Sequence, residues 1–418
     1  MTSTTTDTVL AGLDDIDWAS LEHAYGEAAD VPAQLRALCG EDPEGRRQAV
    51  HTLYSNIFHQ GSRYGASAFA VPFLARLAAA PGLPDRAEAV ALMAALAIGY
   101  DESHLPDGLA VEQWRRQIEE LRAQDPAEVL AAYDAWVAEA TDEGERRVRD
   151  FRRRMYDHDR QLASAEAELA AYDAVRREVP ALTALLADAE PAVRAATAYL
   201  LAWFPEEAAT TLPGLLDLAR RETNPAVSAT ALVAVGLLGD AATAAVLRPF
   251  LTVADRSVRW GAAIALARLG SAGAESAVDA AVLAELAAAE AEEPEPGAPG
   301  IPFHEGDLRG YAAVALAQLA DRYPAEALDA VTTGLASAVG PAAFPVTAAA
   351  LRLAFGPELP AALPAFAELD PGQQRLVRAL ASLGEDTWRW GNFLEILHGW
   401  RLPHSRPELR TYAGLTAD

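Results

Sequence analysis

The sequence predicts an all-α protein, built as a right-handed solenoid of stacked helix pairs that carries a long helical insertion. Three observations predict this architecture: an alanine-rich composition, a repeated helical stripe of apolar residues, and the lack of any convincing strand pattern. Of the 418 residues, 51% are hydrophobic but only 7% are aromatic. Much of the apolar share is alanine, which is the best helix former and lets helices pack closely.

A short pattern recurs four times in the middle of the chain. It centres on Val193, Val227, Val258 and Leu308, and apolar residues follow each centre near positions +4, +7, +8 and +11. This spacing is typical of one helix face. A second apolar helix pattern precedes each of the first three centres, which are 34 and 31 residues apart, the size of a two-helix repeat. One such pair cannot bury its apolar face alone, so we expect successive pairs to stack.

These residues resemble the HEAT-repeat family. The clearest match is the run from Asp188 to Arg194, and the resemblance covers residues 180–325, with weaker matches that begin at Asp42 and Asp370. The whole chain also resembles a group of actinobacterial HEAT-repeat proteins, through residues 59–64 and 400–403.

The resemblance implies that the second helix of each pair lines a concave surface. It places Arg194, Arg259 and Arg309 at a recurrent basic position, where the family often uses the arginine in a ladder to an acid of a neighbouring repeat. Asp188 matches the position of that acid. The alternative is that these arginines contact a ligand.

We predict four segments along the chain. They are N-terminal HEAT-like helix pairs at 1–106, a long charged helical arm at 107–179, central HEAT repeats at 180–325 with a flexible acidic loop at 290–300, and C-terminal helix pairs with a cap at 326–418. Within the arm we predict helices over 111–124, 126–141 and 143–177. The arginine-rich run at 146–154 is surrounded by acids, which favours an exposed, salt-bridged helix over a patch that binds anions or nucleic acid.

The charge of the chain indicates which partners to expect. The net charge is −26 and all 34 basic residues are arginines. Such an acidic surface disfavours nucleic acid and predicts a basic protein partner whose binding is sensitive to salt. Cys39 is the only cysteine, which excludes an intramolecular disulfide and a cysteine zinc cluster. Without a signal peptide or a bilayer-spanning segment in the sequence, we expect a cytoplasmic protein with no membrane partner.

Candidate binding residues fall into two sets, whereas no constellation is typical of catalysis. The eight histidines lack metal-binding spacings, and no nucleophile with its base can be named, so we predict no catalytic residue, no metal and no cofactor. The predicted binding residues are Asn56, His59, Gln60, Arg63 and Tyr64 near the N-terminal end, and Arg194, Tyr199, Arg259, Trp260 and Arg309 in the central repeats. The alternative for the first set is a specialised inter-helix turn, with Gly61 capping one helix and Pro72 in the first turn of the next.

The predicted function is a non-enzymatic scaffold, adaptor or inhibitor that binds a macromolecule on its concave surface. An alternative is a HEAT-like enzyme, either a DNA alkylation repair glycosylase or a protein–chromophore lyase. The glycosylase would use aromatic residues such as Tyr199, Trp203, Trp260 and Tyr311 with a carboxylate. A third interpretation is a structural module that dimerises through the helices at 111–177.

Overall fold

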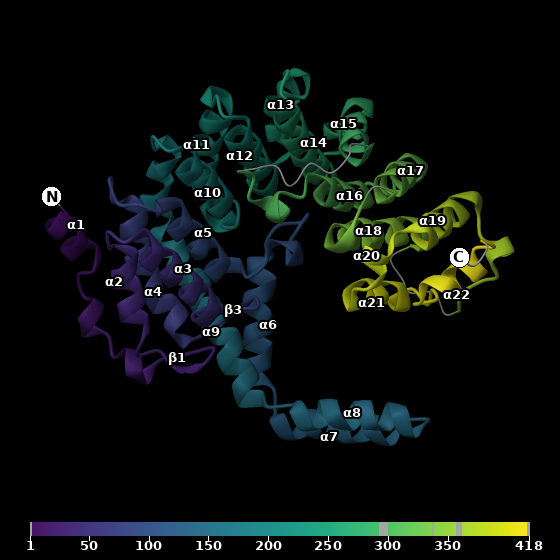
Figure 1. Cartoon of the computed structure of the whole chain (residues 1–418), viewed down its shortest axis with the longest axis horizontal. Helices are drawn as coiled ribbons and strands as arrows, with labels where there is room; N and C mark the ends of the chain where they lie inside the picture. The colour runs from purple at the N-terminus through teal and green to yellow at the C-terminus, as the bar shows by residue number, and fades with distance from the viewer. Residues whose placement is uncertain (1, 292–299, 337, 357–361, 416–418) are drawn as a thin grey trace. The chain divides into compact units, whose positions relative to one another are not determined.

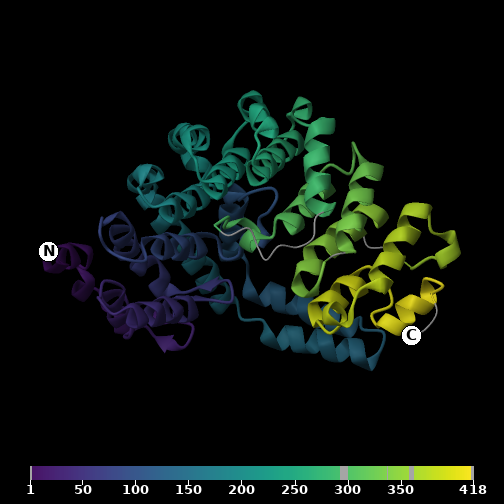
Figure 2. The same cartoon turned by 45° about the horizontal axis from the view of Figure 1, so that its top comes forward.

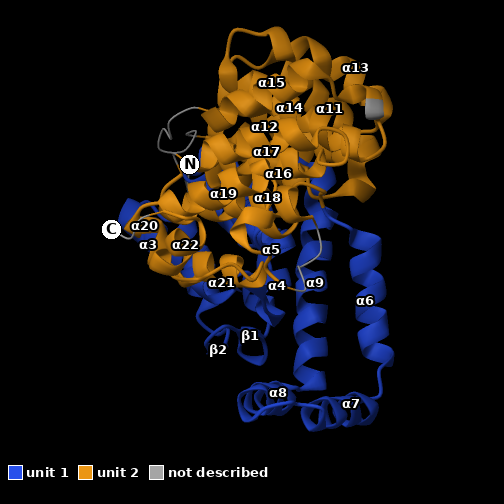
Figure 3. Cartoon of the chain, turned by 90° about the vertical axis from the view of Figure 1, so that its right-hand side faces the viewer, with its two compact units in different colours: residues 1–100, 109–182 blue, residues 101–108, 183–418 orange. Residues whose placement is uncertain are grey.

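The computed structural model describes residues 2–291, 300–336, 338–356 and 362–415. The described residues form helices and two very short hairpins, so the predicted all-α solenoid class is confirmed (Figure 1 and Figure 2). The chain divides into two compact units (Figure 3). Unit 1 contains residues 1–100 and 109–182, and unit 2 contains residues 101–108 and 183–418. The four predicted segments are thus grouped differently, because the arm belongs to unit 1 and a short segment at 101–108 belongs to unit 2.

Unit 2 is a stack of helix pairs in chain order. Figure 1 shows the first helices of the pairs (α11, α13, α15 and α17) on the outer side of this unit and the second helices on its inner side. The second helices are α10 (Pro191–Leu201), α12 (Pro225–Leu238), α14 (Arg256–Ser271), α16 (Leu308–Gln318) and α18 (Ala343–Phe355). The first helices are α11 (Ala208–Arg221), α13 (Ala244–Leu247), α15 (Ala280–Ala291) and α17 (Pro324–Leu335). Helices α19 (Pro371–Ser382), α20 (Glu385–Trp388), α21 (Gly391–Gly399) and α22 (Arg406–Tyr412) complete the unit.

The recurrent sequence pattern marks where the second helices begin. Pro191 and Pro225 occupy first helical positions, where a missing N–H costs nothing. The side chain of Asn224 accepts hydrogen bonds from the N–H groups of Ala226 and Val227, and Asp255 caps α14 in the same way. The pattern therefore marks the start of α10, α12, α14 and α16, and the apolar stripe that follows is buried between neighbours.

Helices α12 and α14 cross at close range through two glycines. A Cβ atom added to Gly236 would lie 2.4 Å from the Cα of Ala265, and one added to Gly261 would lie 2.9 Å from the Cα of Ala229. A side chain that rotates away could not make room for either Cβ atom, because the nearest atoms belong to the backbone.

We expect Gly261→Ala to lower the free energy of unfolding of unit 2 by about 1–3 kcal/mol, since the two helices must separate to admit one methyl group. Gly391→Ala is the matched control, because nothing lies within 4 Å of a Cβ at that position. Denaturant unfolding followed by circular dichroism would compare the two variants. An equal effect of both substitutions would contradict the close crossing.

Unit 1 combines N-terminal helices with a projecting hairpin. Its helices are α1 (Thr2–Val9), α2 (Val31–Leu38), α3 (Pro43–Asn56), α4 (Gly65–Ala79), α5 (Arg86–Ile98), α6 (Val111–Ala123), α7 (Pro126–Ala138), α8 (Glu143–Met155) and α9 (His158–Leu182). The C-terminal half of α9 packs on α4 and α5 through buried residues such as Tyr172, Val175 and Val179. Helices α6 and α9 run side by side, and α7 and α8 lie at their far ends (Figure 3). We call residues 126–155 the arm hairpin.

Three expectations within unit 1 need correction. The helix predicted over 143–177 is two helices, because Tyr156 is extended and the carboxylate of Asp157 accepts from the N–H of Arg160 to start α9. Gly61 does not cap a helix: with Gln60 it forms the turn of a hairpin. Pro72 lies in the middle of α4, which already begins at Gly65.

The sequence analysis did not predict the two short hairpins. Strands β1 (Glu22–His23) and β2 (Gly26–Glu27) pair antiparallel, as do β3 (Phe58–His59) and β4 (Ser62–Arg63).

The predicted acidic loop at 290–300 begins later than expected. Glu290 belongs to α15 and is fully buried. Residues 292–299 lie outside the described residues.

Candidate functional site

The inner face of unit 2 contains a groove of about 1630 Å³. Residues of α14, α16 and α18 line it, together with the segment at 101–108, the turn Phe303–Gly306 and residues of α21. The groove therefore lies on the second helices of successive pairs, which is the surface that the sequence analysis singled out.

The charged residues of the groove are mostly acidic. Its lining includes five carboxylates against three arginines and His304. Glu102, Asp107, Glu305 and Asp321 are exposed, so their charges can act on a molecule that enters. Asp307 is half-buried, and its carboxylate is used locally, because it accepts from the N–H of Gly310.

Apolar side chains supply much of the rest of the lining. Val339 is exposed, and Phe344, Leu353 and Ile396 are half-buried along the same groove. A site with an acidic rim and an apolar floor suits a ligand that is both cationic and apolar.

The segment at 101–108 is held in unit 2 by polar contacts at both of its ends. The carboxylate of Asp101 accepts a hydrogen bond of 2.8 Å from the N–H of His304, and Tyr199 also hydrogen-bonds to it. At the other end, Arg268 donates from Nε to the carbonyl of Asp107 at 2.9 Å, and Gln318 donates to its carboxylate at 2.5 Å. These contacts make the segment a fixed wall of the groove.

Burial changes the chemistry of Asp101. The residue is only 4% exposed, and this burial raises the pKa of its carboxyl to about 7, against the lowering effect of the hydrogen bond from His304. His304 and the next residue, Glu305, both have positive φ angles, near 53° and 52°. Non-glycine residues rarely adopt this conformation, and the bond to Asp101 holds the first of them in it.

Aromatic rings pack behind the groove. Tyr199 lies 4.8 Å from Phe303 and 5.7 Å from Trp203 between ring centroids, and Trp260 lies 5.8 Å from Tyr311. All of these rings except that of Tyr199 are buried. The indole of Trp260 also donates to the carbonyl of Leu308 at 3.0 Å. Tyr199 and Trp260 thus support the groove from behind, and such buried rings offer no platform on which a nucleic-acid base could stack.

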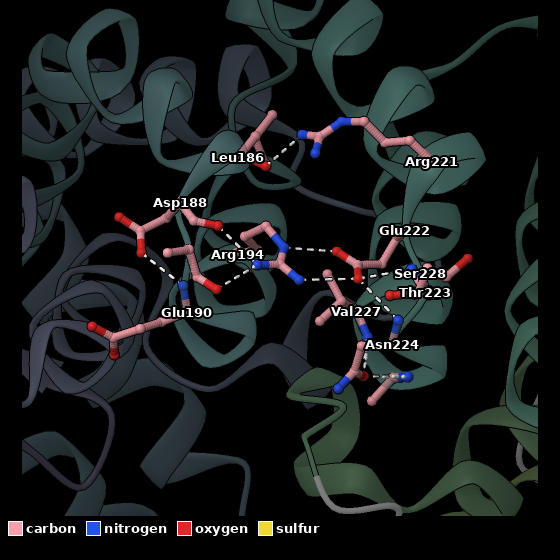
Figure 4. Close-up of polar contacts among 12 residues, drawn as sticks. Leu186, Asp188, Glu190, Arg194, Arg221, Glu222, Thr223, Asn224, Val227 and Ser228 are labelled. Carbon is pink, nitrogen blue, oxygen red and sulfur yellow. Dashed lines mark hydrogen bonds and ion pairs between the residues drawn. The ribbon is translucent and has the colours of Figure 1, made fainter.

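Arg194 links two successive repeats (Figure 4). Its Nε and Nη2 atoms donate to the carboxylate of Glu222 at 2.7 and 3.0 Å, and its Nη1 donates to the carbonyls of Asp188 and Ala189. Glu222 also accepts from the N–H groups of Thr223 and Asn224. Burial alone would raise the pKa of Glu222, but the bonds from Arg194 and from these backbone groups lower it below its usual value.

The same arrangement recurs at two other positions. Arg259 donates to the carboxylate of Glu285 at 3.0 Å and to the carbonyls five and six residues before it. In unit 1, Arg46 donates to Asp85 at 2.6 Å and likewise to the carbonyls five and six residues before it. Arg194 and Arg259 are therefore rungs of a ladder. The acid differs from the expected one, because Asp188 contributes its carbonyl to Arg194 while its carboxylate caps the turn at the N–H of Glu190.

Arg309 differs from the other two arginines of the predicted set. It is buried, lines the groove, and its charge acts on the fully buried Glu290 of the preceding helix. Burial raises the pKa of Glu290 well above its usual value, although Arg309 opposes this.

The predicted N-terminal set belongs to unit 1, whereas the groove residues belong to unit 2. Gln60 and Gly61 have φ angles of 50° and 85°, so they form a two-residue turn that joins β3 to β4. His59 and Tyr64 are half-buried and Gln60 is exposed. This geometry is that of a specialised inter-helix turn.

Asn56 and Arg63 are buried on either side of this turn. The amide of Asn56 donates to Asp30 at 3.1 Å, and Arg63 donates to Glu168 of α9 at 3.3 Å. Burial lowers the pKa of Arg63 and raises that of Glu168. The bond from Arg63 holds the hairpin against α9, and the bond from Asn56 joins the end of α3 to the start of α2.

The groove acids and the segment at 101–108 were missed by the sequence analysis. Glu102 and Asp107 lie in a stretch rich in Pro and Gly between helices, and nothing local indicates that it joins residues some 200 positions later. Among the described residues, no group of three or more metal-ligating side chains is placed to hold an ion. In the same part of the chain, no helix has the length and apolar character needed to cross a bilayer.

Comparison with known proteins gives the following similarities. Residues 212–294 match the model of the HEAT-repeat family. No curated protein matches the chain in sequence. Among solved structures, an engineered protein is 19% identical with a TM-score of 0.29, over 92% of this chain and 97% of that one. The cohesin subunit Scc3 from Z. rouxii (residues 88–1035) is 10% identical with a TM-score of 0.28, over 89% of this chain but only 44% of that one.

Proposed function

Because the chain carries HEAT repeats, matched over residues 212–294, we propose that it is a non-enzymatic scaffold that holds a basic partner protein in the groove of unit 2. The observation that carries the proposal is the groove itself, with its acidic rim and apolar floor. A solenoid presents such a continuous surface without a catalytic pocket.

Electrostatics support a cationic partner. The chain has a net charge of −26, and the exposed charged residues of the groove lining are also net negative, with four acids against Arg352. Such a field accelerates the approach of a basic protein and makes the association sensitive to ionic strength. The apolar floor at Val339, Phe344 and Ile396 would then supply the contacts that ionic strength does not weaken.

Site-specific cross-linking tests this proposal. A photoreactive residue at Ala348, which is exposed in the groove, should capture a basic protein in cells that make this chain. The matched control places the same residue at Ala284, which is exposed on the outer helix α15. The captured protein should bind the purified chain directly and release at high salt. Capture of nucleic acid, or equal capture from both positions, would contradict the proposal.

The groove acids give a quantitative prediction for that partner. We expect the double variant Glu305→Arg and Asp321→Arg to weaken binding roughly tenfold, with most of the change in the association rate. The control variant Glu326→Arg and Glu408→Arg makes the same change in net charge at exposed residues outside the groove lining. Surface plasmon resonance at several salt concentrations would measure the association rate and the affinity of both double variants. Equal loss in both variants would show that net charge, and not the groove, attracts the partner.

A further inference from the structure

Helix α8 presents an apolar stripe to solvent. Val148, Phe151 and Met155 are spaced by three and four residues, so they share one face of the helix, and they are 56%, 57% and 61% exposed. Within α7 and α8, both of which the structure describes in full, no residue is buried. An exposed apolar stripe on a helix generally marks an interaction surface.

The stripe points outward because arginines occupy the side of α8 that faces α7. Arg149 donates to the carbonyl of Trp136, and its guanidinium lies 4.9 Å from the centre of the indole ring. Arg153 donates to the carboxylate of Asp134 at 2.8 Å. The arginines on the polar side of α8 therefore already bond to groups of α7, whereas the apolar side of α8 is not covered by α7 and stays exposed to solvent.

The charge of α8 contrasts with that of the chain. It holds six of the 34 basic residues and three acids, so its net charge is +3, whereas the net charge of the whole chain is −26. On the helix surface, Arg147 and Arg154 flank the stripe on one side and Arg152 flanks it on the other, as their helical spacing requires. Helix α8 is thus a basic, amphipathic element in an acidic protein.

We propose that α8 of one copy of the chain docks in the groove of unit 2 of a second copy. The inference rests on the proposed function, because it fills the same groove with a basic segment. The stripe would meet the apolar floor at Val339, Phe344 and Ile396, and the flanking arginines would meet the exposed acids of the rim.

The dimensions of the two surfaces agree. A helix of 13 residues is about 20 Å long. The groove extends over the three packed helices α14, α16 and α18, and axes of packed helices lie about 8–10 Å apart, so it too extends over about 20 Å. Two α8 helices docking on each other would instead place like charges together, which disfavours that arrangement.

Sedimentation velocity of the full chain tests the inference. We expect association that grows with concentration and weakens with salt. Phe151→Glu in α8 and the groove variant Glu305→Arg with Asp321→Arg should each weaken it at least roughly tenfold. Ala131→Glu, at an exposed position on α7, is the matched control and should leave the association unchanged. A loss caused by the α8 variant but not by the groove variant would overturn the inference, as would a chain that stays monomeric at every concentration.

Cross-linking in a mixture of light and heavy isotope-labelled chains distinguishes a second copy from the same chain. A photoreactive residue at position 151 of one chain should form cross-links to groove residues of another chain, so that the products contain one light and one heavy chain. Products confined to one chain would overturn the proposal of a second copy, and so would binding of the monomer to anionic vesicles through Phe151.

A probe separates the failure of this inference from the failure of the proposed function. The probe is a synthetic helical peptide of unrelated sequence, with a leucine stripe flanked by arginines, titrated into the full chain. If it binds the groove while the chain does not self-associate, the inference fails and the proposed function stands. If the peptide and the chain both fail to bind, both proposals fail.

Discussion

Arg194→Ala is expected to lower the free energy of unfolding by about 3 kcal/mol, because it leaves a carboxylate buried without its cation. The side chain of Glu222 is 3% exposed and that of Arg194 is 13% exposed. Without the guanidinium, Glu222 would keep only the hydrogen bonds from the backbone of Thr223 and Asn224. The carbonyls of Asp188 and Ala189 would lose their donor as well. Denaturant unfolding at neutral pH would measure the change.

The equivalent rung at Arg259 provides the control. Its side chain and that of Glu285 are 27% and 24% exposed, so water screens the pair and compensates for its loss. We therefore expect Arg259→Ala to cost only about 1 kcal/mol. The double variant Arg194→Met with Glu222→Leu should recover most of the loss, since no charge remains buried. Equal losses at Arg194 and Arg259 would show that burial does not determine the strength of the rungs.

Asp101→Asn is expected to remove a pH dependence of stability that the native chain shows between about pH 4 and about pH 7. The pKa of Asp101 is raised from an ordinary 3.8 to about 7 by burial, so the folded chain holds this proton more tightly than the unfolded chain does. The contribution to stability is full below about pH 4 and is lost as the pH rises through about 7. The shift corresponds to a difference of up to about 4 kcal/mol between the two limits.

Unfolding of the native chain and of the Asp101→Asn variant across this pH range would measure the effect. Glu290 is also buried with a raised pKa, but it is present in both proteins, so its contribution cancels in the difference. Hydrogen exchange gives a second measurement: the amides of residues 101–108 should exchange faster as the pH rises, beyond the intrinsic increase, in the native chain only. Parallel stability curves for the two proteins would contradict the assignment to Asp101.

The helix starts could be predicted because their signals are local. Pro191 and Pro225 begin α10 and α12, and the side chains of Asp255 and Asp307 cap α14 and α16. The apolar centre of each pattern lies within one turn of that signal, and capping acts over this distance. The ladder was only partly predictable. Arg194 was placed by resemblance, but its acid is Glu222, which lies 28 residues later at the end of another helix.

Other features depend on contacts that no local pattern records. The bond between Asp101 and His304 joins residues 203 positions apart. Trp260 was predicted to bind a partner, but the packing of α16 over it makes it part of the core. The run at 146–154 was predicted as an exposed, salt-bridged helix, and its pairs with Glu143, Glu145 and Asp150 confirm this. The outward stripe was not predicted, because apolar residues at helical spacing normally face a core.

The path of the chain between the two units has a consequence for synthesis on the ribosome. Residues 101–108 are translated long before α14 and α16, to which Arg268 and Gln318 belong. Residues 101–108 therefore cannot make their contacts in unit 2 until α14 and α16 have been synthesised. The residues before and after this segment, 1–100 and 109–182, belong to unit 1 and can fold earlier. The wall of the groove at residues 101–108 is consequently completed late. A nascent chain arrested before residue 304 would still lack the backbone N–H that donates a hydrogen bond to the carboxylate of Asp101.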